Sequence, residues 1–263
     1  SKRWLDMLFL PRFQPIEIVK PFFIVTLSLM LTAQTKQLYL KYFLSTLFTL
    51  PILMLLVYQP DIGQTLLLTM VWLALIFVSG VNIFVFFIFI LIVGSTLSYL
   101  VIFIPKFEYI KIRLFAFLDS SSSNNYQADK ASDAIINGGF FGKGIGEGTL
   151  NSRVPEAHTD YIISVISEEF GAIVVIGILF LYLIFSYRVI RKINFLNEDL
   201  SKLILTGCIS LILLQTFIHV GVNIRILPTT GMTLPFLSYG GSSIVSTAIL
   251  SGLILNLTKR KLD

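Results

Sequence analysis

The stretch VPEAHTDYIISVISEEFGAIVVIGILFLYLIFSY, residues 154–187, decides the fold class of this chain. Its second half, AIVVIGILFLYLIFSY, contains no ionised side chain, whereas its first half carries Glu156, His158 and Asp160. A helix needs roughly 20 apolar residues to cross the hydrocarbon core of a membrane. The stretch therefore indicates a transmembrane helix that is entered from a charged, water-exposed loop.

The composition places the whole chain in the same setting. Hydrophobic residues make up 55% of the sequence and charged residues 13%, and the mean hydropathy is +0.84. Soluble domains contain about 25% charged residues, so this composition excludes them. No apolar run alternates with a period of two, as the strands of a membrane β-barrel would. We therefore expect an all-α, polytopic membrane helix bundle.

The hydropathy pattern predicts about seven membrane helices, joined in two places by turns too short to allow anything except antiparallel hairpins. They are expected at about residues 17–33, 43–58, 65–80, 83–104, 161–187, 203–222 and 236–257. One long loop, about residues 105–160, interrupts the series. The whole chain, residues 1–263, is expected to form a single transmembrane domain.

Basic residues in the short loops predict the orientation, because such loops remain in the cytoplasm when they are rich in lysine and arginine. If seven helices alternate, one side receives Lys36, Lys41, Arg188, Arg191, Lys192, Lys202, Lys259, Arg260 and Lys261. That side is expected to be cytoplasmic, and the long loop with Asp160 is then external. Lys2, Arg3 and Arg12 are the basic residues that oppose this orientation.

A second unusual segment is NIRILPTTGMTLPFLSYGGSS, residues 223–243. Its two prolines and its Gly240-Gly241 pair cannot continue a regular helix, although apolar spans flank it. Irregular backbone at membrane depth is tolerated only where protein buries it or where it lines a wet cavity. We favour a polar cavity that includes Thr230, Ser238 and Tyr239, and a tight structural turn is the alternative.

Several other polar groups on the predicted outer side have both structural and functional interpretations. Glu17 and Lys20 are spaced to pair with each other on one helix face. Asp61 is placed to cap a helix. Asp160 has the same capping option, but a carboxylate at a helix N-terminus stays ionised and can act as a base.

The long loop contains two further motifs. NGGFFGKGIGEG, residues 137–148, is rich in glycine, but no strand precedes it and no Gly-Lys-Ser/Thr follows, so a nucleotide site is disfavoured. Tight turns are the preferred interpretation, in which bare backbone amides could approach a polar headgroup. RLFAFLD, residues 113–119, is a candidate amphipathic segment at the membrane interface. Arg113 has two interpretations: a structural one, in which its side chain extends its charge into the interfacial water, and a functional one, in which it binds a phosphate.

Five ordered blocks of sequence carry a resemblance that covers nearly the whole chain. RWLD with FQPIEIVK, then QPDIG, then FLD…YQ…GGFFGKGIG, then PEAHTDYIISVISEEFG, and finally LPTTGMTLPFLSYGGSS resemble the SEDS family of bacterial cell-wall polymerases, which includes RodA, FtsW and SpoVE. Their order and spacing are much more specific than any one of them. Family members have ten membrane helices, so the resemblance implies three further helices upstream of Ser1.

The resemblance implies a peptidoglycan glycosyltransferase of the bacterial cytoplasmic (inner) membrane. Such an enzyme polymerises lipid II, a disaccharide-pentapeptide on undecaprenyl pyrophosphate, at the periplasmic face. Its expected partners are a class B penicillin-binding protein transpeptidase, other divisome proteins and membrane lipid, with no role for nucleic acid. The wording of PEAHTD and PTTGMTLPFLSYGGSS favours FtsW, the division polymerase.

The resemblance also assigns roles to individual residues. Asp160 matches the family's catalytic aspartate and is expected to act as general base on an acceptor sugar hydroxyl. The pyrophosphate leaving group needs positive charge, from basic side chains or from a divalent cation, Mg²⁺ or Mn²⁺. The candidate substrate-binding residues are Arg3, Gln14, Lys20, Arg113, Arg153, Glu156, His158, Thr230, Ser238 and Tyr239.

Two departures from the family pattern leave the biological role open. Thr230 stands where FtsW-type sequences commonly have lysine, and Ile16 replaces the serine of a QPSE pattern. A RodA-like elongation polymerase is therefore an alternative. A lipid II flippase and a scaffold that recruits the crosslinking enzyme are others. An ordinary solute transporter is disfavoured, because no inverted repeats and no midplane charges are apparent.

Overall fold

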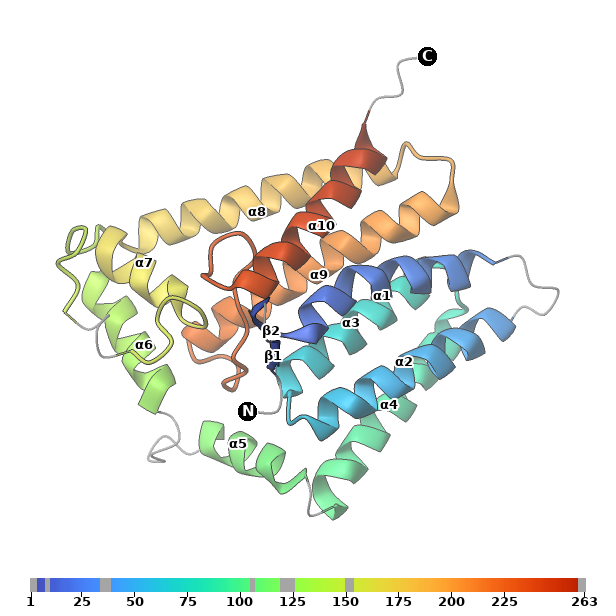
Figure 1. Ribbon diagram of the computed structural model, residues 1–263, viewed down its shortest axis with the longest axis horizontal. Helices are drawn as coiled ribbons and strands as arrows, with labels where there is room; N and C mark the ends of the chain where they lie inside the picture. The colour runs from blue at the N-terminus through green and yellow to red at the C-terminus, as the bar shows by residue number, and fades with distance from the viewer. Residues whose placement is uncertain are drawn as a thin grey trace. The chain divides into compact units, whose positions relative to one another are not determined.

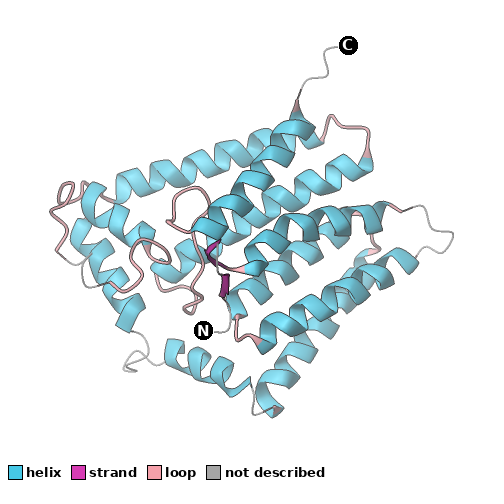
Figure 2. Cartoon of the chain, viewed as in Figure 1, coloured by secondary structure: helices cyan, strands magenta, loops and turns pink. Residues whose placement is uncertain are grey.

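The structure, a computed structural model, describes residues 4–7, 10–33, 39–104, 107–118, 126–149 and 154–259. The regular secondary structure of this part is helical apart from one small β-hairpin, and loops join the elements (Figures 1 and 2). Its elements are β1 (Leu5–Met7), β2 (Leu10–Phe13), α1 (Pro15–Thr32), α2 (Leu40–Tyr58), α3 (Ile62–Val78), α4 (Ile83–Phe103), α5 (Glu108–Leu118), α6 (Tyr126–Gly138), α7 (Ile162–Phe170), α8 (Ala172–Ile193), α9 (Asp199–Asn223) and α10 (Gly241–Thr258).

Seven apolar helices correspond to the seven predicted spans. Within the described residues, α1, α2, α4, α8, α9 and α10 are long and apolar enough to cross a membrane. Helix α3 has 17 residues and extends about 25 Å, which is near the lower limit for a span. The predicted all-α membrane bundle is thus confirmed, whereas the antiparallel β1–β2 hairpin was not predicted.

The predicted continuous helix at residues 161–187 is wrong, because the chain breaks at Gly171. Helix α7 ends at Phe170 and α8 begins at Ala172. Gly171 has φ = +85°, a left-handed conformation that glycine adopts without steric cost. The apolar composition continues through this break, so hydropathy alone does not reveal it.

The last membrane span was predicted at residues 236–257, but helix α10 begins at Gly241, five residues after the predicted start. Phe236 has φ = +68°, and the backbone N–H groups of Leu237 and Ser238 both donate to the carbonyl of Leu234. These residues therefore form a turn that belongs to the irregular segment, as the sequence predicted for residues 223–243.

The long loop contains helices α5 and α6. Helix α5 covers Arg113 to Leu118 of the expected amphipathic segment, and Asp119 lies outside the described residues. Helix α6 packs against α7. It buries Ala128, Ala131, Ala134 and Gly138, which recur every three or four residues and form one small-residue face.

The chain divides into two compact units. Unit 1 comprises residues 1–99, 186–214 and 241–263, and unit 2 comprises residues 100–185 and 215–240. In unit 1, α1 packs against α2, α3 and α10 around the fully buried Ile24, Leu27 and Leu75. The helices α8 and α9 each contribute one part to each unit.

One end of unit 1 contains two of the basic residues that the sequence assigned to the cytoplasm, Lys41 and Lys202. A pocket there is lined by the last residues of α1 and α3, together with Lys41 of α2 and Asp199 and Lys202 of α9. Lys202 donates to Asp199 at 3.1 Å. Lys41 and Lys202 thus lie at the same end, as alternating helices require.

We predict that Gly138→Ala destabilises the α6–α7 pair. A Cβ at Gly138 would lie 2.0 Å from the carbonyl oxygen of Ser167, so one backbone has to move, at a cost of about 1–3 kcal/mol or more. Gly177→Ala in α8 is the control, because its Cβ would meet nothing within 4 Å. Thermal melts in detergent measure both variants. An equal melting temperature for the two variants would contradict this packing.

Candidate functional site

Side chains of neighbouring helices supply several of the hydrogen bonds of the irregular segment from Arg225 to Gly240. Gln215 Nε2 donates to the Thr233 carbonyl at 2.8 Å. His219 Nδ1 lies 2.7 Å from the Met232 carbonyl, and because a carbonyl only accepts, Nδ1 carries the proton. The Tyr182 hydroxyl donates to the Pro235 carbonyl. Side chains from α8 and α9 therefore hold this non-helical backbone, which water cannot solvate inside a membrane.

The turn that carries Asp160 is organised around one carbonyl group. Glu156 has φ = +56°, and its carbonyl accepts the backbone N–H groups of Thr159, Asp160 and Tyr161 at 3.1, 3.0 and 3.4 Å. The Thr159 hydroxyl also donates to the Glu156 carboxylate at 3.0 Å. The turn thus presents Glu156, His158 and Asp160 from a fixed backbone.

Three hydrogen bonds tie this turn to the irregular segment and to the end of α9. Asn223 Nδ2 donates to the Asp160 carbonyl at 3.2 Å. The Ser238 hydroxyl donates to the Thr159 carbonyl at 2.6 Å, and the Tyr239 backbone N–H donates to the His158 carbonyl at 2.9 Å. Segments more than 60 residues apart in sequence therefore meet at Asp160.

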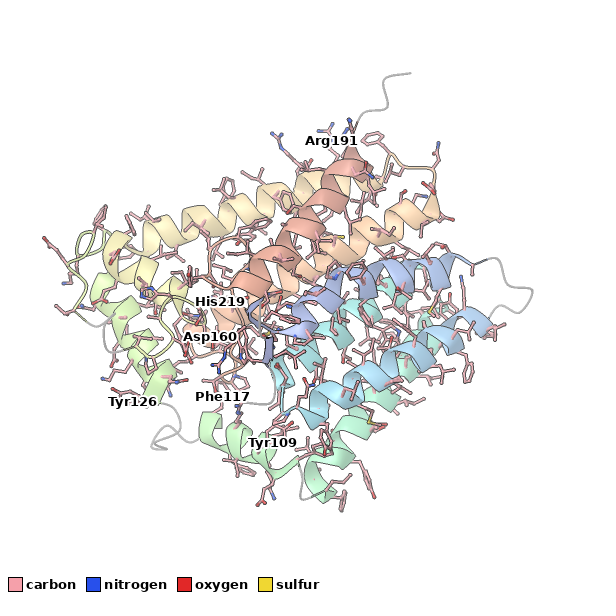
Figure 3. All side chains as sticks on the ribbon, in the orientation of Figure 1. Tyr109, Phe117, Tyr126, Asp160, Arg191 and His219 are labelled. Carbon is pink, nitrogen blue, oxygen red and sulfur yellow. The ribbon has the colours of Figure 1, made fainter. Side chains whose placement is uncertain are left out.

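The Asp160 carboxylate lies against the backbone of the irregular segment. A Cβ at Gly231 would be 3.2 Å from Asp160 Oδ2, and Gly231 has φ = +65°. Figure 3 shows Asp160 near the end of α9 that bears His219. The N-cap of α7 is Tyr161, so Asp160 does not occupy the capping position. Asp160 is half-buried, which leaves its side chain accessible.

Tyr161 reports the electrostatic environment beside Asp160. Burial and, to a lesser extent, the negative charge of Asp160 raise the pKa of its hydroxyl, the positive charge of Arg113 opposes this rise, and the resulting pKa is about 12. Arg113 of α5 is thus close enough to act on the same small region as Asp160. A base and a cation are therefore present together in unit 2.

Buried polar atoms without partners surround the same place. Among the described residues, Thr230 Oγ1, Asn223 Oδ1 and His219 Nε2 are buried and have no hydrogen-bond partner within the protein. Such orphaned atoms are rare in folded proteins, because each costs about 1–3 kcal/mol. They indicate that water or a bound polar ligand completes the hydrogen bonding near Asp160.

A second polar cluster lies in unit 1 and is almost completely buried. Lys20 Nζ donates to Glu17 Oε1 at 2.7 Å, and Gln64 Nε2 donates to the same oxygen at 2.9 Å. Asp61 accepts from the Gln64 backbone at 3.3 Å and from Gln14 Nε2 at 3.1 Å. The predicted Glu17–Lys20 pair and the predicted Asp61 cap are confirmed.

The predicted substrate-binding residues fall into three groups. Arg113, Glu156, His158, Thr230, Ser238 and Tyr239 belong to unit 2 with Asp160. Gln14 and Lys20 belong to unit 1, where Lys20 is fully buried and bonded to Glu17. Arg3 and Arg153 lie outside the described residues.

Sequence reasoning missed two contributors to the Asp160 region, Asn223 and Gly231, and the ion pair formed by Arg225 of the irregular segment. Asn223 holds the Asp160 carbonyl, and Gly231 allows the close approach of its carboxylate. Arg225 forms a 2.8 Å ion pair with Asp129 of α6, between half-buried partners. A polar Asn223 directly after an apolar run was the available signal, whereas the Arg225–Asp129 pair leaves no local sequence signal.

The described side chains do not form a ready-made metal site. No group of three or more His, Cys, Asp and Glu residues among them is arranged to hold an ion. Glu156 and Asp160 alone could supply two carboxylates, and Mg²⁺ commonly uses one or two carboxylates together with water and substrate phosphates. The expected Mg²⁺ or Mn²⁺ therefore stays a prediction.

The fold and the site define a class: a multi-pass α-helical membrane protein with a polar site built on irregular backbone. The chain belongs to the FtsW/RodA/SpoVE family of cell cycle proteins, whose pattern it matches over residues 1–262. It is 33% identical to the probable peptidoglycan glycosyltransferase FtsW of Caulobacter vibrioides, over 99% of this chain and 66% of that protein. It is 34% identical to the FtsW of Nitrosomonas europaea, over 98% of this chain and 68% of that protein.

Solved structures of related proteins have the same fold. A structure described as the coordination of polymerization and crosslinking by a peptidoglycan synthase complex superposes with a TM-score of 0.77, at 26% identity over 97% of this chain and 72% of that chain. An aspartate-to-alanine mutant of the rod shape determining protein RodA from Thermus thermophilus gives a TM-score of 0.67, at 25% identity over 99% and 70% of the two chains.

We predict that Lys20→Met destabilises the protein by about 3–5 kcal/mol, because it leaves the Glu17 carboxylate buried without its cation. Lys202→Met is the matched control: its pair with Asp199 is partly exposed, and its loss costs at most about 1 kcal/mol. The double variant Glu17→Gln/Lys20→Met is expected to recover part of the lost stability. Thermal or denaturant unfolding measures all three, and equal effects of the two lysine substitutions would contradict a structural role for the buried pair.

Proposed function

We propose that this chain is the membrane part of a peptidoglycan glycosyltransferase that polymerises lipid II at the outer face of the bacterial cytoplasmic membrane. The observation that carries the proposal is the half-buried Asp160 carboxylate, which is held beside Gly231 where a charged turn meets irregular membrane backbone. The names of the FtsW relatives support the reaction class.

Asp160 acts as the general base in this reaction. Its carboxylate accepts the proton of an acceptor sugar hydroxyl while that oxygen attacks the anomeric carbon of the donor. The new glycosidic bond forms as the bond between the anomeric carbon and the pyrophosphate breaks, and the pyrophosphate leaves with the bonding electrons. Asp160 then releases its proton to water.

Arg113 is the described cation best placed to stabilise the leaving pyrophosphate. Its charge already acts on Tyr161, the neighbour of Asp160, and a guanidinium can bind two phosphate oxygens at once. Thr230 Oγ1, which lacks a protein partner among the described residues, is available to a polar substrate group. Lys20 contributes no accessible charge in this arrangement, because it is enclosed with Glu17.

The partner of this polymerase is a class B penicillin-binding protein that crosslinks the new glycan strands. A related structure is described as coordinating polymerization with crosslinking, which supports such a pairing. The FtsW names of the relatives favour a role in division over RodA-like elongation, together with other divisome proteins. In this proposal the active site faces the periplasm.

Asp160→Asn in the full-length enzyme is expected to lower the rate of polymerisation by about 100-fold to 10,000-fold, the usual effect of removing a general base. The amide is nearly the same size and leaves the backbone bonds of the turn in place. Glu156→Gln is the matched control, and we expect it to have a smaller effect. Glycan synthesis from labelled lipid II, together with the partner transpeptidase, measures the rate.

Two results of that experiment would contradict the proposal. One is a folded Asp160→Asn protein that polymerises at nearly the wild-type rate. The other is a wild-type protein that moves lipid II between leaflets without forming glycan, which would favour a flippase. A thermal melt and a lipid II binding assay show whether each variant is intact.

The proposed orientation predicts which residues an impermeant thiol reagent reaches in intact cells. Glu147 and Asn194 are both exposed, and they flank α8 on opposite sides. A cysteine at Glu147 should react from outside, whereas one at Asn194 should react only after the membrane is permeabilised. The native Cys208 is buried and should contribute little background. The reverse pattern would place Asp160 at the cytoplasmic face and remove the proposed mechanism.

A further inference from the structure

Three large apolar side chains stand out from the turn that follows α6. Phe140, Phe141 and Ile145 are 72%, 85% and 78% exposed, although none of them belongs to a membrane-spanning helix. Exposure of so much apolar surface to water is unfavourable. Several strongly exposed large apolar side chains within one short turn point to a contact surface. We call these three residues the apolar cluster.

The backbone beneath the apolar cluster is fixed by hydrogen bonds to α7 and α8. The N–H groups of Lys143 and Gly144 donate to the carbonyls of Glu168 and Glu169 at 2.9 and 3.0 Å. In the other direction, the Ala172 N–H donates to the Gly139 carbonyl at 2.9 Å. The turn is thus attached on both sides of the break between α7 and α8.

Glycines allow the backbone of this turn to lie very close to the backbone at the break between α7 and α8. A Cβ at Gly142 would lie 2.2 Å from the Glu169 carbonyl oxygen, and a Cβ at Gly171 would lie 2.2 Å from the Phe140 carbonyl oxygen. No other residue type fits at either position without backbone movement. The backbone of the turn is therefore held in place, and a local rearrangement of the turn does not bury its apolar side chains.

The position of the turn identifies what covers the apolar cluster. It is bonded to the first residues of α8, whose Ile173 and Ile176 are 51% and 62% exposed. In a membrane, an exposed apolar helix face contacts lipid or another helix, and the backbone bonds place the apolar cluster next to the exposed apolar residues at the start of α8. Lys143, which is also exposed, lies between Phe141 and Ile145 in sequence.

We propose that the apolar cluster inserts into the membrane leaflet at the N-terminal end of α8, with Lys143 beside an anionic phosphate headgroup. Aromatic and aliphatic side chains with an adjacent lysine are typical of segments that bind the interface of anionic membranes. The occupant is lipid rather than a protein partner, because the cluster is bonded to the helix end that enters the bilayer. This inference does not depend on the proposed enzymatic activity.

Insertion of the apolar cluster also sets the depth of the candidate site. The same turn bonds the last residues of α7, and Asn137 Nδ2 donates to the Glu168 carboxylate at 2.9 Å. Helix α7 begins at Ile162, two residues after Asp160. An anchor at one end of this short helix therefore fixes how far Asp160 lies from the headgroups.

Quenching by brominated lipids tests the insertion directly. Phe141→Trp in the full-length protein, reconstituted in nanodiscs, places a fluorophore in the apolar cluster, and subtraction of the wild-type signal removes Trp4 and Trp72. We expect its emission to be lost in nanodiscs whose lipid chains are brominated near the headgroup. Glu147→Trp, in the exposed polar part of the same loop, is the matched control and should lose little.

The role of Lys143 is tested in the same nanodiscs. Bromination of phosphatidylglycerol alone, in a mixture with unbrominated phosphatidylcholine, should quench Phe141→Trp more than bromination of phosphatidylcholine alone. Adding Lys143→Gln should abolish that difference. An unchanged preference would overturn the headgroup contact.

Two outcomes would overturn the insertion itself. One is Trp emission at position 141 that bromination leaves unchanged and that iodide in the aqueous phase quenches. The other is protection of position 141 only after a partner transpeptidase is added, which would assign the apolar cluster to a protein interface. A thermal melt confirms that each variant is folded, and none of these readouts requires polymerisation.

Discussion

Unit 2 depends on side chains that complete hydrogen bonds for backbone that cannot complete its own. The segment from Arg225 to Gly240 forms no regular helix, so its backbone N–H and C=O groups need partners other than those of a helix. Gln215, His219 and Ser238 supply or receive these bonds, and each of them is buried. The same bonds bring the carbonyls of Thr159 and Asp160 against the segment. The requirement to satisfy the backbone and the construction of a polar site are therefore met by one set of contacts.

The two polar clusters differ in what their geometry allows. In unit 1, Lys20 and Glu17 are enclosed and neutralise each other, so their principal contribution is to the stability and specificity of the helix packing. In unit 2, Asp160 is half-buried and lies among polar atoms that the described protein leaves unpaired. An accessible charge with incomplete hydrogen bonding is suited to a ligand, whereas a closed ion pair is not. This contrast separates residues that the sequence had grouped together as polar residues on the outer side.

Hydropathy predicted the membrane helices well, because the requirement for about 20 apolar residues acts on every span. It failed at Gly171 and at Phe236, where a single backbone angle ends or delays a helix while the composition stays apolar. The site was predictable in part: Asp160 and Ser238 lie in segments whose polarity is unusual for a membrane chain. Asn223 left only a weak signal, a polar residue directly after an apolar run, and the Arg225–Asp129 pair left none, because the roles of these residues arise from contacts between distant segments. The short β1–β2 hairpin likewise had no alternating pattern long enough to reveal it.

The attachment of Asp160 has a genetic consequence. Its turn is held through main-chain atoms: its N–H donates to the Glu156 carbonyl, and its own carbonyl accepts from Asn223. These bonds survive any change of side chain that the space permits, so a residue without a carboxylate can occupy the position in an otherwise native fold. A cell that carries such an allele beside the normal gene would produce two populations of chains with the same outer surface. Under the proposed mechanism, in which Asp160 is the general base, these variant chains are inactive but still occupy places in the proposed assembly, and the allele is then expected to be dominant rather than recessive.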